Sequence, residues 1–171
     1  MADEYLTLTL DTGSGEGGDV KIKLRPDLAP GHVERITELA KEGFYDGVVF
    51  HRVIPGFMAQ GGDPTGTGTS GSKKPNLKAE FSSEPHVRGV CSMARTSDPN
   101  SATAQFFINV VDNGFLNHTS PTPQGWGYAV FGKVVSGAEI VKKIEGLPTG
   151  RKGFHDDVPK DDVVIEKAVA I

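Results

Sequence analysis

The residue types best suited to chemistry are concentrated in one segment, Phe50–Asp63. It combines a cation, a phenyl ring, a thioether and an amide: Arg52, Phe57, Met58 and Gln60. Such groups can offer one ligand a permanent charge, apolar contact and hydrogen bonds. The same residues also fit a simpler interpretation, in which two strands meet at a tight turn at Pro55-Gly56 and the apolar side chains fill the core.

A second segment favours the functional interpretation. Met93-Ala94-Arg95-Thr96 is followed, after a short gap, by Ser101-Ala102-Thr103-Ala104-Gln105-Phe106-Phe107-Ile108-Asn109. It again places a cation, small polar residues, an amide and phenyl rings close together. We therefore treat both segments as parts of one candidate site.

A nucleotide site is not predicted, although Gly66–Gly71 matches the dinucleotide pattern G-x-G-x-x-G. That pattern binds a dinucleotide only between a strand and the start of a helix. Here Gly61–Pro64 precedes the glycines and Pro75 follows closely. The segment is interpreted as a flexible loop beside some other site.

Metal and nucleophile chemistry also lack support. None of the five histidines has an H-x-x-H or H-E-x-x-H partner, and the chain has a single cysteine, Cys91. His155-Asp156-Asp157 is interpreted as a surface turn, and Cys91 as a small core residue in a strand. No G-x-S-x-G elbow supports serine hydrolysis. We expect no metal and no cofactor.

The elements that must position the site follow from periodicity. Leucines alternate with threonines over Tyr5–Leu10, and Asp19–Leu24 alternates again, so these two segments predict a β-hairpin. Helical spacing over Pro30–Glu42 predicts a first helix. The capping-box pattern Ser136-Gly137-Ala138-Glu139 predicts the start of a second helix, with its apolar stripe at Ile140, Val141 and Ile144.

The remaining segments predict strands at Val48–Ile54, Phe57–Gln60, Val87–Ala94, Gln105–Val110, Tyr128–Val135 and Val163–Ile171. About eight short strands with few helices favour a mainly β fold, an eight-stranded antiparallel closed barrel capped by two α-helices. Small barrels fill their interior with side chains, so the site is expected on the outer wall or in the loops. Residues 1–171 are expected to form a single domain.

Composition excludes several classes of partner. The formal net charge is −4, which argues against nucleic acid as a partner. No apolar run approaches the ~20 residues of a membrane span, and no signal peptide is evident at the N-terminus. We expect a cytoplasmic protein, and a monomer because nothing in the sequence indicates a partner helix.

The two segments resemble the signature of the cyclophilins, the cyclosporin-binding family of peptidyl-prolyl cis-trans isomerases. The resemblance runs from about Tyr5 to Ile171 and includes Gly43-Phe44-Tyr45-Asp46-Gly47 and Val130-Phe131-Gly132-Lys133-Val134. It is strongest to the compact bacterial cytosolic members, which share Met93-Ala94-Arg95-Thr96 and Gln124-Gly125-Trp126-Gly127-Tyr128. It implies an eight-stranded barrel with two capping helices, rotamase activity and a role in protein folding. The implied partners are proline-containing peptides and unfolded or folding proteins.

The resemblance also implies roles for individual residues. Arg52 is the expected catalytic arginine, with Gln60 orienting it and the substrate. The proline pocket is expected to be lined by Phe57, Met58, Phe107 and Leu116. The peptide backbone is expected to contact Gln60, Ala94 and Arg95, the last mainly through its main chain. Gln105 is expected on the side wall toward a neighbouring pocket, whose approach is formed by Thr65, Gly66, Thr96 and Thr103.

Three positions at the expected site differ from many family members. Phe115 replaces the tryptophan that many eukaryotic cyclophilins use to hydrogen-bond cyclosporin, which implies weak cyclosporin binding. Tyr128 occupies the position of a histidine in many eukaryotic members, and Arg95 that of an asparagine. Isomerase activity is still expected.

Isomerisation before proline suits a site without a nucleophile or cofactor. Rotation about a peptide bond costs ~18–20 kcal/mol, although cis and trans are close in energy before proline. The main alternative is a chaperone or adaptor that binds proline segments on the same fold without turnover. A hydrolase on a β-barrel is a third candidate, but the sequence lacks its nucleophile and base.

Overall fold

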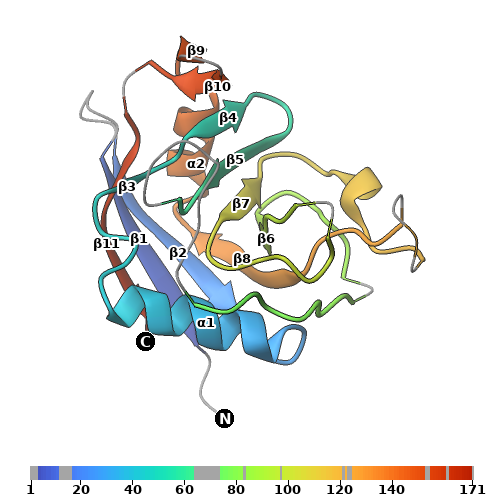
Figure 1. Ribbon diagram of the computed structural model, residues 1–171. Helices are drawn as coiled ribbons and strands as arrows, with labels where there is room; N and C mark the ends of the chain where they lie inside the picture. Colours follow the sequence, from blue (N-terminus) through green and yellow to red (C-terminus); the bar gives the residue numbers. More distant parts are fainter. Residues whose placement is uncertain are drawn as a thin grey trace.

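The computed structural model describes residues 4–11, 17–63, 74–82, 84–96, 98–120, 122, 125–152, 155–160 and 162–170. They form a mainly β structure with two α-helices (Figure 1), which confirms the predicted fold class. The strands are β1 (Tyr5–Asp11), β2 (Gly18–Leu24), β3 (Val48–Val49), β4 (Arg52–Ile54), β5 (Met58–Gly61), β6 (Val90–Met93), β7 (Phe106–Asn109), β8 (Val130–Ser136), β9 (Thr149–Lys152), β10 (His155–Pro159) and β11 (Val164–Ala170). The helices are α1 (Pro30–Lys41), the 3-10 helix η1 (Gly114–Leu116) and α2 (Ala138–Glu145).

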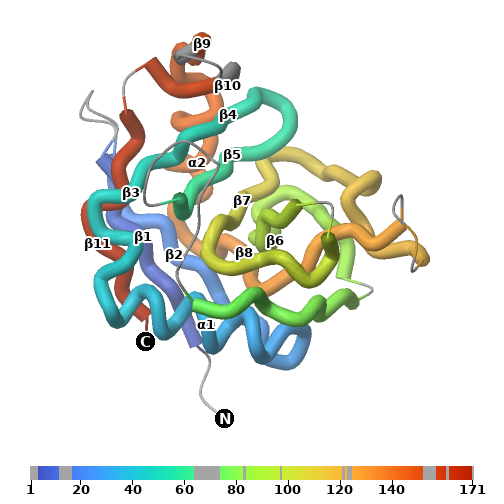
Figure 2. Tube along the Cα trace, in the orientation of Figure 1, coloured from blue at the N-terminus to red at the C-terminus, as the bar shows by residue number. Residues whose placement is uncertain are grey.

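Nine strands form one sheet in the order β3-β11-β1-β2-β8-β6-β7-β5-β4. Figure 2 shows the chain curling round so that β1, β2 and β11 lie on one side and β5 to β8 on the other. The result is an antiparallel half-barrel, which differs slightly in strand count and closure from the predicted eight-stranded barrel. Its two edge strands, β3 and β4, follow one another in the chain.

The predicted strand Val48–Ile54 is two strands rather than one. Val48 and Val49 pair with β11, whereas β4 pairs with β5 at the other edge of the sheet. The chain must therefore leave one ladder and join another at Phe50-His51. The backbone N–H of Phe50 still donates to Val163 O at 2.9 Å, and its ring is buried in the core.

The barrel interior is filled by side chains. The inward residues of β1 and β2 are buried at every second position, which confirms the period-two prediction for the hairpin. Phe106 lies at the centre of an edge-to-face cluster with Tyr45, Phe50 and Phe131, at centroid distances of 5.6, 5.9 and 6.3 Å. Cys91 is also fully buried, as predicted, and burial raises the pKa of its thiol.

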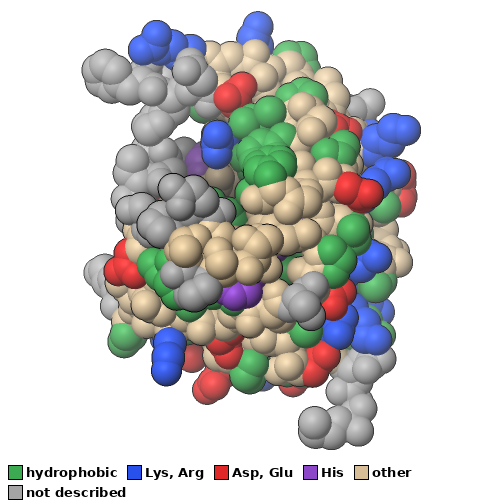
Figure 3. Space-filling view, turned by 90° about the vertical axis from the view of Figure 1, so that its right-hand side faces the viewer, with side chains coloured by type: hydrophobic (Ala, Val, Ile, Leu, Met, Phe, Trp, Pro, Cys, Tyr) green, Lys and Arg blue, Asp and Glu red, His purple; other side chains and the backbone are tan. Residues whose placement is uncertain are grey.

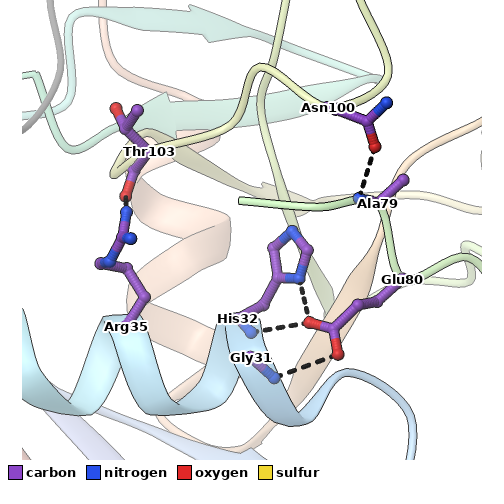
Figure 4. A network of polar contacts seen from close by, with 7 residues as sticks. All are labelled: Gly31, His32, Arg35, Ala79, Glu80, Asn100 and Thr103. Carbon is purple, nitrogen blue, oxygen red and sulfur yellow. Dashed lines mark hydrogen bonds and ion pairs between the residues drawn. The ribbon is translucent and has the colours of Figure 1, made fainter. Parts of the chain in front are cut away.

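Helix α1 begins at Pro30 and packs against β11 and β8. The first N–H groups of a helix have no partner within the helix and attract a negative charge. Here the carboxylate of Glu80 accepts hydrogen bonds from the N–H groups of Gly31 and His32, at 3.0 and 2.8 Å. It also contacts Nδ1 of His32 (Figure 4). A loop residue distant in sequence therefore caps α1.

The capping box predicted for α2 was wrong. Ser136 is the last residue of β8, and the N-cap is Gly137, which forms no side-chain cap. The backbone of Gly137 has a φ of +88°, and a Cβ there would lie 2.3 Å from Asp19 O. The sharp passage from β8 into α2 therefore depends on glycine rather than on a serine side chain.

The hairpin of β9 and β10 was not predicted from the sequence. Its strands contain glycine, proline and several charged residues, which are depleted in strands, and its register is irregular. In the residues described, no helix is long and apolar enough to cross a membrane.

Candidate active site

The hairpin of β4 and β5 brings the first predicted segment together. Phe57 N donates to Ile54 O at 3.0 Å, and Gly56 has a φ of +72°, which together define a type II turn with Pro55 at its first corner. Across the hairpin, Arg52 lies opposite Gln60 and Ile54 opposite Met58. Opposite residues share a face, so these side chains point outward while Val53 and Ala59 enter the core.

Strand β7 adds Phe107 to the same outer face, because Phe107 pairs with Gln60 across β5 and β7. Met58, Phe107 and Leu116 form a small hydrophobic cluster separate from the main core. Ile54, Phe57, Ala94 and Tyr128 pack against it. The outer wall of the half-barrel therefore carries its own apolar patch, where the sequence led us to expect the site.

A pocket of about 150 Å³ opens in this patch. Its lining is Arg52, Phe57, Met58, Gln60, Ala94, Arg95, Phe107, Leu116 and Tyr128, all of them residues predicted for the site. Figure 3 shows this side of the molecule, with hydrophobic side chains gathered beside a hollow and a basic side chain at its edge. The pocket joins apolar contact, a charge and an amide within reach of one ligand.

A larger cavity of about 210 Å³ lies between β7, β8 and α2. Its walls are mainly aliphatic, with Arg88, Lys142 and Glu145 among its lining residues. None of the residues predicted for the site lines it. The smaller pocket is the better candidate because it combines the two sequence segments.

One wall of the pocket is held by the segment before β7. Gln60 Nε2 donates to Gln105 Oε1 at 3.1 Å, and Ala94 N donates to Gln105 O at 2.9 Å. The same segment is held by two further hydrogen bonds. Tyr45 Oη donates to Ala104 O at 2.8 Å. Arg35 Nη1, on α1, donates to Thr103 O at 3.2 Å, as Figure 4 shows. The amide expected to orient Arg52 is therefore itself fixed by Gln105.

The floor of the pocket rests on a buried histidine that sequence reasoning considered only as a metal ligand. His86 stacks on Phe107 at 6.3 Å, and Phe107 meets Tyr128 edge to face at 5.3 Å. The two ring nitrogens of His86 contact Ser92 Oγ at 2.9 Å and Asn117 Oδ1 at 3.0 Å. Burial lowers the pKa of His86, so the ring is neutral and supports Phe107 as an apolar group. No sequence pattern points to this contact.

Arg95 lies at the other end of the pocket. Its Nε and Nη2 donate to Gly127 O at 3.1 and 2.5 Å, and its Nη1 donates to Thr96 O at 2.7 Å. The guanidinium carbon lies 4.7 Å from the ring centroid of Tyr128 and 5.9 Å from that of Phe81. Two aromatic rings and two carbonyl oxygens thus hold the guanidinium.

Four predicted residues in the described part of the chain do not line the pocket itself: Phe115, Thr96, Gln105 and Thr103. Phe115 is 72% exposed and stacks on Phe57 at 5.6 Å, so it lies at the rim. Thr96 is exposed, and its hydroxyl donates to Ser101 Oγ at 2.8 Å. Gln105 affects the pocket indirectly, because it accepts a hydrogen bond from Gln60. Thr65 and the Gly66–Gly71 motif lie outside the described residues. Within the part of the chain that the structure describes, no group of acidic, histidine or cysteine side chains could hold a metal ion.

Comparison with known proteins decides the family. The model of the cyclophilin type peptidyl-prolyl cis-trans isomerase family matches residues 7–170. The chain belongs to the cyclophilin family. It is 51% identical to peptidyl-prolyl cis-trans isomerase B of Escherichia coli over 150 residues, covering 87% of this chain and 92% of that one. It is 47% identical to the isomerase cyp18 of Streptomyces antibioticus over 165 residues, covering 95% and 96%.

Solved cyclophilin structures share the fold. A cyclophilin of Cryptosporidium parvum superposes with a TM-score of 0.85 at 28% identity, covering 99% of this chain and 98% of that one. A second structure of that protein, determined in the presence of the dipeptide Ala-Pro, gives a TM-score of 0.82 at 29% identity, with coverage of 96% and 97%. The prediction that this chain is a cyclophilin-type isomerase is confirmed.

Proposed function

We propose that this cyclophilin accelerates cis/trans rotation of Xaa-Pro bonds in the pocket on the outer wall of β4, β5 and β7. One observation carries the proposal: Arg52, Gln60 and Phe107 lie opposite one another on neighbouring strands, and all three line the same pocket. The pocket is sized for a small group such as a proline ring. Phe57, Met58, Phe107 and Leu116 would clamp that ring by apolar contact.

Arg52 would supply the chemistry. In the planar amide the nitrogen lone pair is delocalised, and at the twisted transition state it returns to the nitrogen. A fixed cationic donor aimed at that nitrogen stabilises the twisted state more than either planar state, and so lowers the barrier. Arg52 is permanently charged and lies at the exposed edge of the pocket. No bond is made or broken, so neither a nucleophile nor a cofactor is required.

Gln60 would orient the arginine and the substrate backbone. Its amide nitrogen donates a hydrogen bond to Gln105 Oε1. This bond fixes the plane of the Gln60 amide and therefore also the position of its carbonyl oxygen, which is an acceptor. Rotation about the Xaa-Pro bond requires that the proline ring is held while the carbonyl group before it turns. Ala94 and Arg95 line the part of the pocket where the peptide backbone would run.

The test is a coupled isomerisation assay on a short proline peptide. Arg52→Ala should lower kcat/KM by about 10²–10³, as loss of a transition-state donor typically does, and should leave the fold intact. Arg88→Ala is the matched control, because Arg88 is exposed and lies outside this pocket. Near-normal activity of Arg52→Ala would contradict the mechanism. A wild type that binds the peptide but does not accelerate its isomerisation would instead favour a non-catalytic peptide-binding chaperone or adaptor.

We further propose that the clients are unfolded or folding proteins with accessible proline segments, bound in the cytoplasm by a monomer. Cyclosporin should bind only weakly, since the rim carries the phenyl ring of Phe115. A phenyl ring offers apolar area but no hydrogen-bond donor.

A further inference from the structure

The pocket carries more positive charge than the proposed catalysis requires. Two of its lining residues, Arg52 and Arg95, are cations, and none of the nine is acidic. The chain as a whole has a formal net charge of −4, so the pocket is a basic site on an acidic protein. A pocket lined by one sign of charge concentrates ligand groups of the opposite sign.

Arg95 is held rigidly but its charge is not neutralised. Its hydrogen bonds go to the neutral carbonyl oxygens of Gly127 and Thr96, and its guanidinium lies over the ring of Tyr128. Among the ion pairs of the described residues, none includes Arg95 or Arg52. The nearby carboxylate of Asp98 accepts a hydrogen bond from Asn100 N at 2.8 Å within its own turn.

The position of Arg95 determines which residues of a bound peptide its guanidinium can contact. Its guanidinium lies over Tyr128, and Tyr128 packs edge to face against Phe107 at the floor of the pocket. A peptide advances at most about 3.3–3.6 Å per residue when extended. With the length of its own side chain added, an acidic residue one or two positions from the proline can reach Arg95.

We propose that Arg95 is a specificity-determining residue, which makes the enzyme favour proline peptides that carry Asp or Glu directly before or directly after the proline. The proposal rests on the function proposed above and names the substrate class of the same pocket. Guanidinium and carboxylate match each other as planar, two-pronged partners, and the planar face of Arg95 is already set by Tyr128. The preference should be about twofold to fivefold in kcat/KM, the range of a partly exposed ion pair.

The experiment compares short proline peptides that differ only in charge. One series carries Ala, Glu or Lys immediately before the proline, and a second series carries the same residues after it. For wild type at low salt, at least one series should rank Glu above Ala above Lys. The ratio of Glu to Lys should fall toward one at about 1 M salt, where the Debye length is about 3 Å.

Three variants test whether Arg95 causes the preference for acidic peptides. Arg95→Gln should bring the Glu-to-Lys ratio close to one, and Arg95→Lys should keep Glu above Lys because the charge remains. Arg88→Gln removes an exposed arginine outside the pocket and should leave the ratio unchanged. The ratio is compared rather than the rate, because loss of the Gly127 contact also affects the pocket wall.

Two results would overturn the proposal. One is a wild-type enzyme that ranks Glu no higher than Lys in both series, and the other is an unchanged ratio in Arg95→Gln. If Arg95→Gln does not fold, the salt dependence of the wild type and the ratio in Arg95→Lys decide. A wild type that accelerates no peptide at all would instead refute the isomerase function itself.

Discussion

Glu145, at the C-terminal end of α2, accepts a hydrogen bond at 2.7 Å from the backbone N–H of Gly56, 89 residues away in the chain. In a type II turn the N–H of the second corner residue has no partner inside the turn, and Gly56 occupies that corner. The next residue, Phe57, lines the pocket, and its carbonyl accepts from Asn113 Nδ2 at 2.9 Å. The turn is thus held from both sides, because Val110 N also donates to Phe57 O at 3.1 Å, and Glu145 is one of its anchors.

Removing the acceptor at Glu145 should loosen the pocket. A net hydrogen bond is worth about 0.5–1.5 kcal/mol, so Glu145→Leu should raise KM about twofold to tenfold, with a smaller change in kcat. Glu145→Gln keeps an acceptor oxygen and should restore most of the binding. Glu139→Leu, an exposed substitution on the same helix, is the control. Equal KM values for Glu145→Leu and wild type would show that the turn does not need this anchor.

The left-handed backbone of Gly56 permits a clean test of strain. A Cβ at Gly56 would meet no atom within 4 Å. Alanine there should therefore lower the free energy of unfolding only through the strain of its φ of +72°. That conformation costs an L-residue about 1–2 kcal/mol. Gly114 is equally open but has no such φ, so Gly114→Ala is the matched control and should not destabilise the protein. Urea unfolding of both variants measures the difference, and equal stability would contradict the strain argument.

Stability should fall as the pH drops below the ordinary histidine pKa of 6.5. Burial lowers the pKa of His86, and burial also lowers that of His32 despite its hydrogen bond with Glu80. Below pH 6.5 the unfolded chain therefore binds protons that the folded chain does not, and protonation favours unfolding. Above pH 6.5 both states are neutral at these rings and this contribution is constant.

Glu80 extends the same trend to lower pH. Burial alone would raise the pKa of Glu80, but hydrogen bonds from His32 and Gly31 outweigh it and hold that pKa below its ordinary 4.5. Its contribution is thus present above pH 4.5 and is lost as the pH falls through its folded value. Chemical unfolding from pH 8 to about pH 3 measures both effects. A free energy of unfolding that is flat or rises on acidification would contradict them.

Residues that the family resemblance named lie together around one pocket, whereas the strands beside it differ from those predicted. Alternation in Tyr5–Leu10 reports burial on one face, which is a local property, and β1 follows it closely. The break at Phe50-His51 depends on which partner strand each half meets, and no local pattern carries that information. The cap that Glu80 places on α1 and the support that His86 gives Phe107 also depend on contacts distant in sequence.

The capping box at Ser136 shows the opposite failure, in which a local pattern was present but tertiary pairing overrode it. Ser136 pairs with Lys21 and so completes β8. The close approach of Gly137 to Asp19 then fixes where α2 can begin. A helix signal of a few residues is weaker than a strand pairing joined to an existing sheet.

Phe115 at the rim of the pocket should limit how tightly cyclosporin binds. Phe115 is 72% exposed and already stacks on Phe57, so an indole can replace its ring without entering the core. Phe115→Trp adds an N–H donor at the edge of the pocket, and one added hydrogen bond should tighten inhibition by about twofold to tenfold. Val135→Trp adds the same indole at a half-exposed position on β8, and should leave inhibition unchanged. Inhibition titrations of the isomerase assay compare the two variants. If both behave as wild type, an indole N–H at position 115 does not strengthen cyclosporin binding, and the rim donor does not limit it.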